Sequence, residues 1–86
     1  MRYLKLEYMT KQVNVNIRKI RELAGMTREY VAAELNMTPS GFGKIERGEV
    51  DLTISKLLAI AQVLKVPPSS ILYFDTSILF ENQIQK

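Results

Sequence analysis

Start signals for helices recur along the middle of the chain, and their spacing limits what it can fold into more than any other feature. The clearest is Thr38-Pro39, where the threonine can cap a helix and the proline fills the first helical position without wasting a donor. Thr27 and Thr53 offer the same cap before two further apolar segments. Pro67-Pro68 ends one helix and starts another. This pattern predicts an all-α domain of five short helices.

Stop signals separate these segments. Gly25 ends the first helix, which starts near Asn14, and Gly48 lies near the end of the third. Asn36 stands where the chain must turn, because asparagine tolerates the left-handed conformation better than most residues. Between the signals, apolar residues recur three and four positions apart, as on one face of a helix. The residues predicted to face inward are Ile17, Ile20, Ala24, Val31, Ala32, Leu35, Phe42, Ile45, Ile54, Leu57, Leu58, Ala61 and Leu64.

The two ends of the chain follow other patterns. Residues Arg2 to Met9 alternate between apolar and polar, which favours a short strand, with a helical extension as the alternative. The run from Tyr73 to Phe80 is too apolar for a free tail, so it either folds back on the core or helps to form a dimer, together with the N-terminal segment. We therefore expect an N-terminal extension (1–13), a helical domain (14–74) and a C-terminal tail (75–86), with both extensions as candidate dimer or partner contacts.

Composition argues against an enzyme. A chain of 86 residues with 47% apolar residues forms one small core rather than a buried cleft. It has no cysteine and no histidine, so the commonest general base and the thiolate and imidazole metal ligands are missing. We therefore expect no catalysis, no metal and no cofactor.

The net charge of +3 permits a polyanionic partner. Four of the cations, Arg18, Lys19, Arg21 and Arg28, lie in the first half of the chain. No apolar run of the signal-peptide kind opens the sequence, and none approaches the roughly 18 residues of a membrane span. A cytoplasmic protein is expected.

The run from Arg28 to Arg47, REYVAAELNMTPSGFGKIER, resembles the helix-turn-helix of the phage-repressor/Cro family, the lambda-repressor-like or xenobiotic-response-element type. The matching positions are the small Ala32 where the two helices cross, Val31 and Leu35, which face inward, Phe42 and Ile45, which pack the second helix of the pair on the core, and the sequence Ile45-Glu46-Arg47-Gly48 at the end of that helix. The resemblance covers about Val15 to Leu72. It implies a homodimeric transcriptional repressor of bacterial or phage origin that binds double-stranded DNA.

The resemblance also implies roles for single residues. In the family, the position of Arg28 contacts a phosphate or an outer base, those of Ser40 and Lys44 reach base edges, and that of Arg47 holds a phosphate. A helix can do this because it fits the major groove, where base edges present a distinguishing pattern. The predicted DNA-binding residues are Thr27, Arg28, Thr38, Pro39, Ser40, Gly41, Gly43, Lys44 and Arg47.

Two further residues are predicted to have a structural role, and three others differ from what the family usually has at their positions. Arg21 and Glu46 match a buried ion pair that links the first helix to the end of the third. Pro39 stands where many relatives place a polar side chain that reads bases. Gly41 and Gly43 each lower the helix propensity by about 0.8–1 kcal/mol relative to alanine. Either the slim helix presses its backbone closer to the groove, or these positions face solvent or another protein and tolerate glycine.

The loop after the third helix carries Glu49 and Asp51, although in the family this loop lies near phosphates. Two carboxylates there repel DNA, and Lys44 and Arg47 offset them in part. Few phosphate contacts imply modest affinity and a shallow salt dependence.

Two other functions stay open. One is an antitoxin-type regulator whose apolar tail covers a toxin partner. The other is a protein-interaction module that keeps the fold with weak or no DNA binding, which Pro39, the two glycines and the two carboxylates favour.

Overall fold

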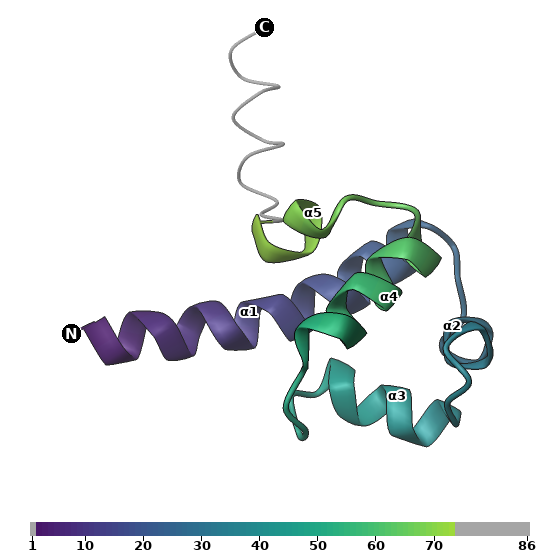
Figure 1. Cartoon of the computed structure of the whole chain (residues 1–86), viewed down its shortest axis with the longest axis horizontal. Coiled ribbons are helices and arrows are strands. Elements are labelled where there is room, and N and C mark those ends of the chain that lie inside the picture. The colour runs from purple at the N-terminus through teal and green to yellow at the C-terminus, as the bar shows by residue number, and fades with distance from the viewer. Residues whose placement is uncertain (1, 74–86) are drawn as a thin grey trace, which may run out of the picture.

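The computed structural model describes the backbone of residues 2–73 and the side chains of residues 12–73. This part of the chain forms five α-helices and no strand (Figure 1), so the predicted all-α fold is confirmed. The helices are α1 (Arg2–Leu23), α2 (Arg28–Glu34), α3 (Pro39–Glu46), α4 (Ile54–Leu64) and α5 (Pro68–Tyr73). None of the helices in residues 2–73 has the length and hydropathy needed to cross a membrane.

The predicted threonine caps are present. Thr27, Thr38 and Thr53 each accept, through Oγ1, a hydrogen bond from the backbone N–H three residues later, at 3.0, 3.0 and 3.1 Å. Pro39 lies in the first turn of α3, as its fixed φ and missing N–H favour. These caps satisfy donors that a helix cannot pair internally, and they set where α2, α3 and α4 begin.

Residues with positive φ end the helices. Asn36 has a φ of 57° between α2 and α3, and Gly25 has a φ of 73° after α1, both as predicted. Lys65 has a φ of 62° and ends α4 before the two prolines are reached. The sequence did not indicate this last turn, because lysine carries a Cβ that disfavours the left-handed region.

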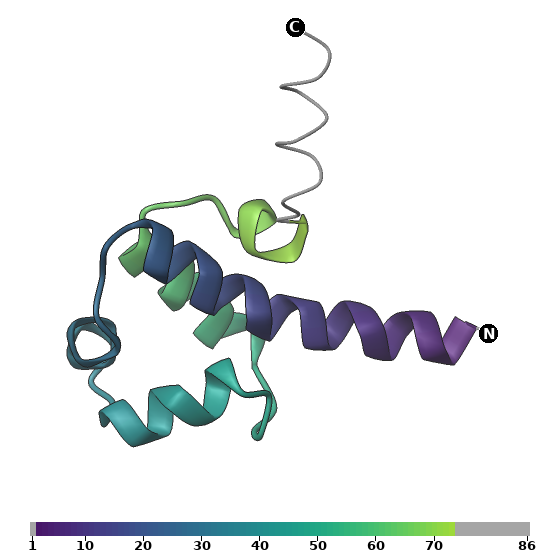
Figure 2. The same cartoon turned by 180° about the vertical axis from the view of Figure 1, so that it is seen from behind.

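The strand predicted for Arg2 to Met9 is wrong. α1 is continuous from Arg2 to Leu23, so the helical alternative is correct. Figure 1 and Figure 2 show its first half projecting beyond the other helices. A lone strand would leave its backbone groups without partners, whereas a helix pairs them internally and no glycine or proline interrupts this segment. The predicted C-terminal tail, 75–86, and the apolar run from Tyr73 to Phe80, apart from Tyr73 itself, lie outside the described residues.

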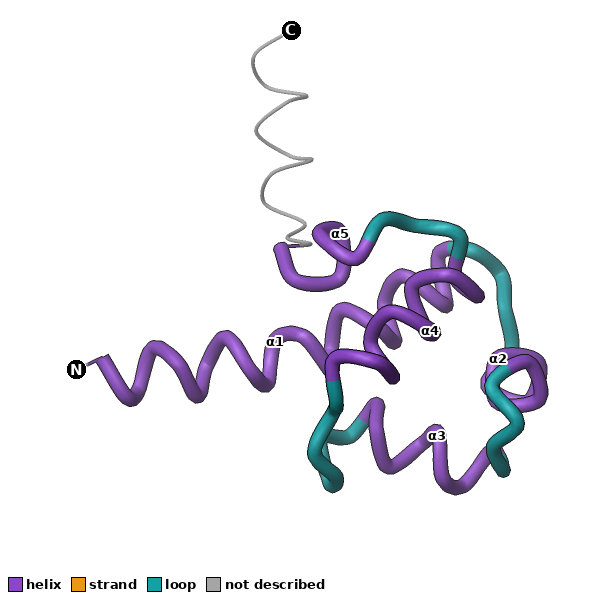
Figure 3. The backbone as a smooth tube through the Cα atoms, viewed as in Figure 1, coloured by secondary structure: helices purple, strands orange, loops and turns teal. Residues whose placement is uncertain are grey.

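All five helices contribute to one core, around which they wrap as the tube in Figure 3 shows. Its buried apolar residues are Ile17, Ile20, Val31, Ala32, Phe42, Ile45, Ile60, Ala61, Leu64 and Ile71. The inward face predicted for α4 is partly wrong, because Ile54 and Leu58 are 76% and 50% exposed and Ile60 is fully buried. Ala24 is exposed as well. The buried stripe of α4 thus runs through Leu57, Ile60, Ala61 and Leu64.

Asn16 is a fully buried polar residue that ties the first helix to the last. Its Nδ2 donates to the carbonyl oxygen of Ile71 at 2.7 Å, and its Oδ1 accepts from Nε2 of Gln12 at 3.0 Å. A buried polar group without a partner costs about 1–3 kcal/mol, so this bond fixes the position of α5 on α1.

Candidate nucleic-acid interface

α2 and α3 form the helix-turn-helix that positions the candidate site. Ala32 of α2 and Phe42 and Ile45 of α3 are buried together in the core, and the two helices are in contact. In Figure 1, α2 is seen end-on while α3 lies across the view, so the two run in different directions. The N–H of Met37 closes the turn by donating to the carbonyl oxygen of Ala32 at 2.8 Å. One face of α3 is therefore seated on the core and the opposite face is free to meet a ligand.

The free face begins at the N-terminus of α3. Thr38, Pro39 and Ser40 are exposed, and Lys44 is exposed one turn after Ser40 on the same side of the helix. Thr27, at the start of α2, is exposed too. The structure thus brings the predicted base-reading pair, Ser40 and Lys44, onto one accessible surface.

The two glycines of α3 differ in what surrounds them. A Cβ added at Gly41 would lie 3.1 Å from the capping Oγ1 of Thr38, so the glycine leaves room for the cap. Gly43 is buried, and a Cβ there would lie 3.0 Å from Nη1 of Arg47 and 3.6 Å from Cδ of Arg28. The open surface expected at Gly43 is therefore absent, because two arginine side chains cover its backbone.

Glu46, the last residue of α3, is a buried carboxylate shared by two arginines. Its side chain is 1% exposed. Nε of Arg21 donates to its Oε2 at 2.6 Å and Nε of Arg28 donates to its Oε1 at 3.0 Å. Arg21 also donates through Nη1 to the carbonyl oxygen of Met26 at 2.9 Å. The predicted partners Arg21 and Glu46 are in contact, and Arg28, whose side chain is 42% exposed, joins them from the first residue of α2.

Arg47, directly after α3, has a different partner. Its Nε donates to Oε2 of Glu49 at 2.7 Å and its Nη2 to Oε1 at 3.5 Å, and both side chains are about half exposed. The hydrogen bond with Glu49 raises the pKa of Arg47, and the same bond lowers the pKa of Glu49. Both groups are therefore charged at neutral pH, and a phosphate at Arg47 has to compete with a carboxylate already bound there.

Arg28, Lys44 and Arg47 together form what we call the basic face of α3. Arg28 and Arg47 approach Gly43 from α2 and from the end of α3, and Lys44 is its neighbour in the chain. The charge of Lys44 also helps to lower the pKa of Glu49, which places the two within electrostatic reach. Such a face can hold anionic phosphates beside the exposed N-terminal turn of α3.

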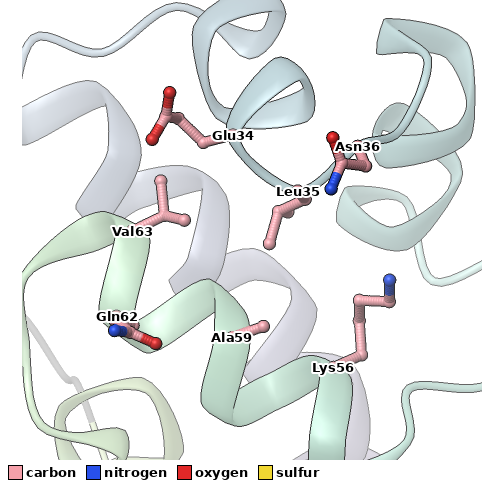
Figure 4. Close-up of a pocket in the computed structure, with 7 residues that line it drawn as sticks. All are labelled: Glu34, Leu35, Asn36, Lys56, Ala59, Gln62 and Val63. Carbon is pink, nitrogen blue, oxygen red and sulfur yellow. The ribbon is translucent and has the colours of Figure 1, made fainter.

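A separate hollow of about 450 Å³ lies between the end of α2 and α4 (Figure 4). The close-up shows the charged ends of Glu34 and Lys56 on opposite sides of it, with the aliphatic Leu35 and Val63 between them. None of the predicted DNA-binding residues lines this hollow.

The sequence did not indicate two features of the site. The pairing of Arg47 with Glu49 has only a spacing of two residues to suggest it, and that spacing in a loop fixes no geometry. The covering of Gly43 by Arg28 depends on how α2 crosses α3, which no local pattern contains. The only available signal was the spacing of four residues between Gly43 and Arg47, which places the arginine one helical turn after the glycine.

Comparison with known proteins adds two findings. A family model described as helix-turn-helix matches residues 17–71. Among solved structures, the chain is similar to the restriction-modification controller protein C.AhdI from Aeromonas hydrophila, with 23% sequence identity and a TM-score of 0.67. The match covers 76% of this chain and 97% of that one, and at this identity it shows a shared fold. No match was found among curated proteins.

Proposed function

The chain belongs to the Cro/C1-type helix-turn-helix family of DNA-binding transcriptional regulators, and from that premise we propose that it is a homodimeric repressor that reads a specific duplex sequence. Such a regulator acts where the genome is, so the proposal includes the cytoplasm of a bacterium, with a bacterial or phage gene as its source. The observation that carries it is the seating of α3, whose exposed Ser40 and Lys44 share one side while Phe42 and Ile45 hold the other on the core.

In the proposed complex, the N-terminal half of α3 enters the major groove. Ser40 and Lys44 meet base edges, because they stand one turn apart on the exposed side. Arg28 and Arg47 flank this surface and bind phosphates, which position the helix without reading sequence. Thr27 and Thr38 are exposed at the starts of α2 and α3 and add contacts to the backbone. Pro39 and Gly41 belong to the same turn and bring the backbone of α3 near the groove, whereas Gly43 contributes by giving room to the arginines.

Selection from a random duplex library tests the proposal. The protein should recover an inverted repeat whose half-sites lie about 34 Å, or one helical turn, apart. Replacing Arg28 and Lys44 together with alanine should lower affinity for the recovered sequence by about 30-fold or more, since each well-placed contact contributes roughly 1–3 kcal/mol.

A matched control distinguishes the loss of direct DNA contacts from the loss of two positive charges. The Arg18→Ala, Lys19→Ala double variant removes the same two residue types from α1 and should bind nearly as tightly as the parent. An equal loss in both double variants would mean that charge alone drives binding, and recovery of no motif would remove the sequence-specific reader.

The homodimer is supported by exposed apolar residues on and beside α4. Ile54 and Leu58 are 76% and 50% exposed and stand four residues apart, on one side of the helix. Val50 and Leu72, 43% and 41% exposed, line an adjoining hollow of about 390 Å³ that Leu57 of α4 also lines. An apolar surface of this kind on a small domain is typical of a contact with another chain, and a second copy buries the same residues on both sides.

Replacing Ile54 with lysine should therefore shift the protein from dimer to monomer in sedimentation experiments at micromolar concentration, because a buried charge without a partner opposes association. Leu23→Lys is the control, since Leu23 is 73% exposed at the far end of α1 and should leave the dimer intact. A parent protein that sediments as a monomer at high concentration would contradict the proposed dimer.

The engagement of Arg47 by Glu49 favours a second candidate, a protein-interaction module or antitoxin-type regulator with weak DNA binding. If this candidate is correct, the Arg28→Ala, Lys44→Ala variant should still bind a protein partner through the exposed apolar residues on and beside α4. The library selection separates the repressor from the protein-interaction module, because the module recovers no motif, whereas an antitoxin-type regulator is identified by its toxin partner.

A further inference from the structure

Arg28 and Arg47 both lie against Gly43, but the carboxylates that hold them differ in burial. Glu46, which holds Arg28, is 1% exposed and is fixed by Arg21 as well. Glu49, which holds Arg47, is 50% exposed and stands in a loop. A buried carboxylate that is hydrogen-bonded to two arginines cannot leave them without disrupting the core. An exposed carboxylate can rotate away from its partner into solvent.

The partner of Arg47 also occupies the edge that a phosphate would use. Nε and Nη2 form the side of a guanidinium that binds two oxygens at once, and both donate to the Glu49 carboxylate. The remaining amino group, Nη1, lies against the backbone at Gly43. The Nε–Nη2 edge of the Arg47 guanidinium is thus occupied within the protein, while the side chain as a whole stays 53% exposed.

From this arrangement we propose that Glu49 is a specificity-determining residue that acts as an internal phosphate mimic. It keeps Arg47 off the DNA backbone when α3 is not seated in its own sequence. The inference rests on the proposed function and deepens it, by assigning to one exposed carboxylate the control of non-specific binding.

The physical basis is competition. In a complex with random DNA, the protein gains only phosphate contacts. Arg47 then exchanges the Glu49 carboxylate for a phosphate, which adds little binding free energy. In the complex with its own sequence, base contacts bring α3 fully into the groove, and a fixed phosphate then replaces Glu49 at short range. The carboxylate therefore weakens random binding more than specific binding, and the ratio between the two rises.

The test measures binding of the full chain to a random-sequence duplex and to the selected sequence over a series of salt concentrations. Glu49→Gln should steepen the slope of log affinity against log salt for random DNA by about 0.9, because one more phosphate is neutralised. At about 0.1 M salt, that slope corresponds to roughly 8-fold tighter binding. Affinity for the selected sequence should rise less, so the specificity ratio falls.

Asp51→Asn is the matched control, since Asp51 is exposed two residues further along the same loop and its loss changes the net charge equally. It should leave the slope for random DNA unchanged. In an Arg47→Gln background, Glu49→Gln should also lose its effect on the slope, because the guanidinium it releases is no longer there.

Equal effects of Glu49→Gln and Asp51→Asn would overturn the inference while leaving the proposed function intact, since both would then act through net charge. An effect of Glu49→Gln that persists without Arg47 would overturn it as well. If the parent protein binds neither duplex even at low salt, the proposed function itself fails, and the inference with it.

Discussion

Replacing Glu46 with alanine is expected to lower the free energy of unfolding by about 3–5 kcal/mol, as for other buried ion pairs that lose one partner. The carboxylate accepts from Nε of Arg21 at 2.6 Å and from Nε of Arg28 at 3.0 Å, so one substitution deprives two guanidiniums of their partner. Arg21 is itself buried, with a side chain 8% exposed, and its charge would keep only the carbonyl oxygen of Met26 and the exposed Glu22 as partners.

Urea denaturation and the thermal midpoint both measure this effect. In a domain of this size, each kcal/mol corresponds to about 4–8 °C in Tm. Glu22→Ala is the matched control, because Glu22 lies 3.9 Å from the same Arg21 but is 59% exposed. It should cost no more than about 1 kcal/mol, as surface pairs do. An unchanged midpoint in Glu46→Ala would refute the structural role of the pair.

Phe42→Ala should destabilise the domain by a similar amount, about 3–5 kcal/mol, by removing buried surface and leaving a cavity. Phe42 is fully buried and is the largest fully buried side chain among residues 12–73. Because small domains are stable by only about 5–15 kcal/mol, the variant should be extensively unfolded well below the parent midpoint.

Phe42→Leu and Tyr30→Ala complete this experiment. The leucine variant refills part of the cavity and should recover much of the stability. Tyr30 is 47% exposed on α2, so losing its ring should cost far less than losing that of Phe42. Equal losses for the two aromatic residues would show that Phe42 does not seat α3 in solution.

Much of the fold could be predicted because its signals are local. Thr27, Thr38 and Thr53 cap helices through bonds to groups three residues away, which a short stretch of sequence contains in full. Asn36 takes the left-handed conformation that its residue type permits. The seating of α3 by Phe42 and Ile45 follows from a spacing of three on one helix face.

What could not be predicted depends on distant neighbours. Ile54 and Ile60 are the same residue type on one helix, and only the positions of the other helices decide that the first is exposed and the second buried. At the N-terminus, alternation over a few residues resembled a strand, but a strand needs a partner strand, and residues 2–73 contain none.

The candidate site shows the same division. The contact of Arg21 with Glu46 was expected from the family resemblance, whereas the addition of Arg28 to the same carboxylate was not. Gly43 was expected to be bare, and the crossing of α2 and α3 instead places two arginines over it. The family resemblance therefore predicted one contact of the site, whereas the contacts that depend on how α2 crosses α3 were not predicted.

The hydrogen bond from Asn16 to the carbonyl oxygen of Ile71 joins residues 55 positions apart and has a consequence for synthesis in the cell. While the chain is being translated, α1 leaves the ribosome before the other four helices. Until Ile71 follows, the side-chain amide of Asn16 lacks the carbonyl oxygen to which it donates. The helix-turn-helix can form its local turns in that interval, but the core closes only when Ile71 has emerged. The last helix thus completes the core, and in a nascent chain the candidate interface can take its final form only once nearly the whole described domain has been made.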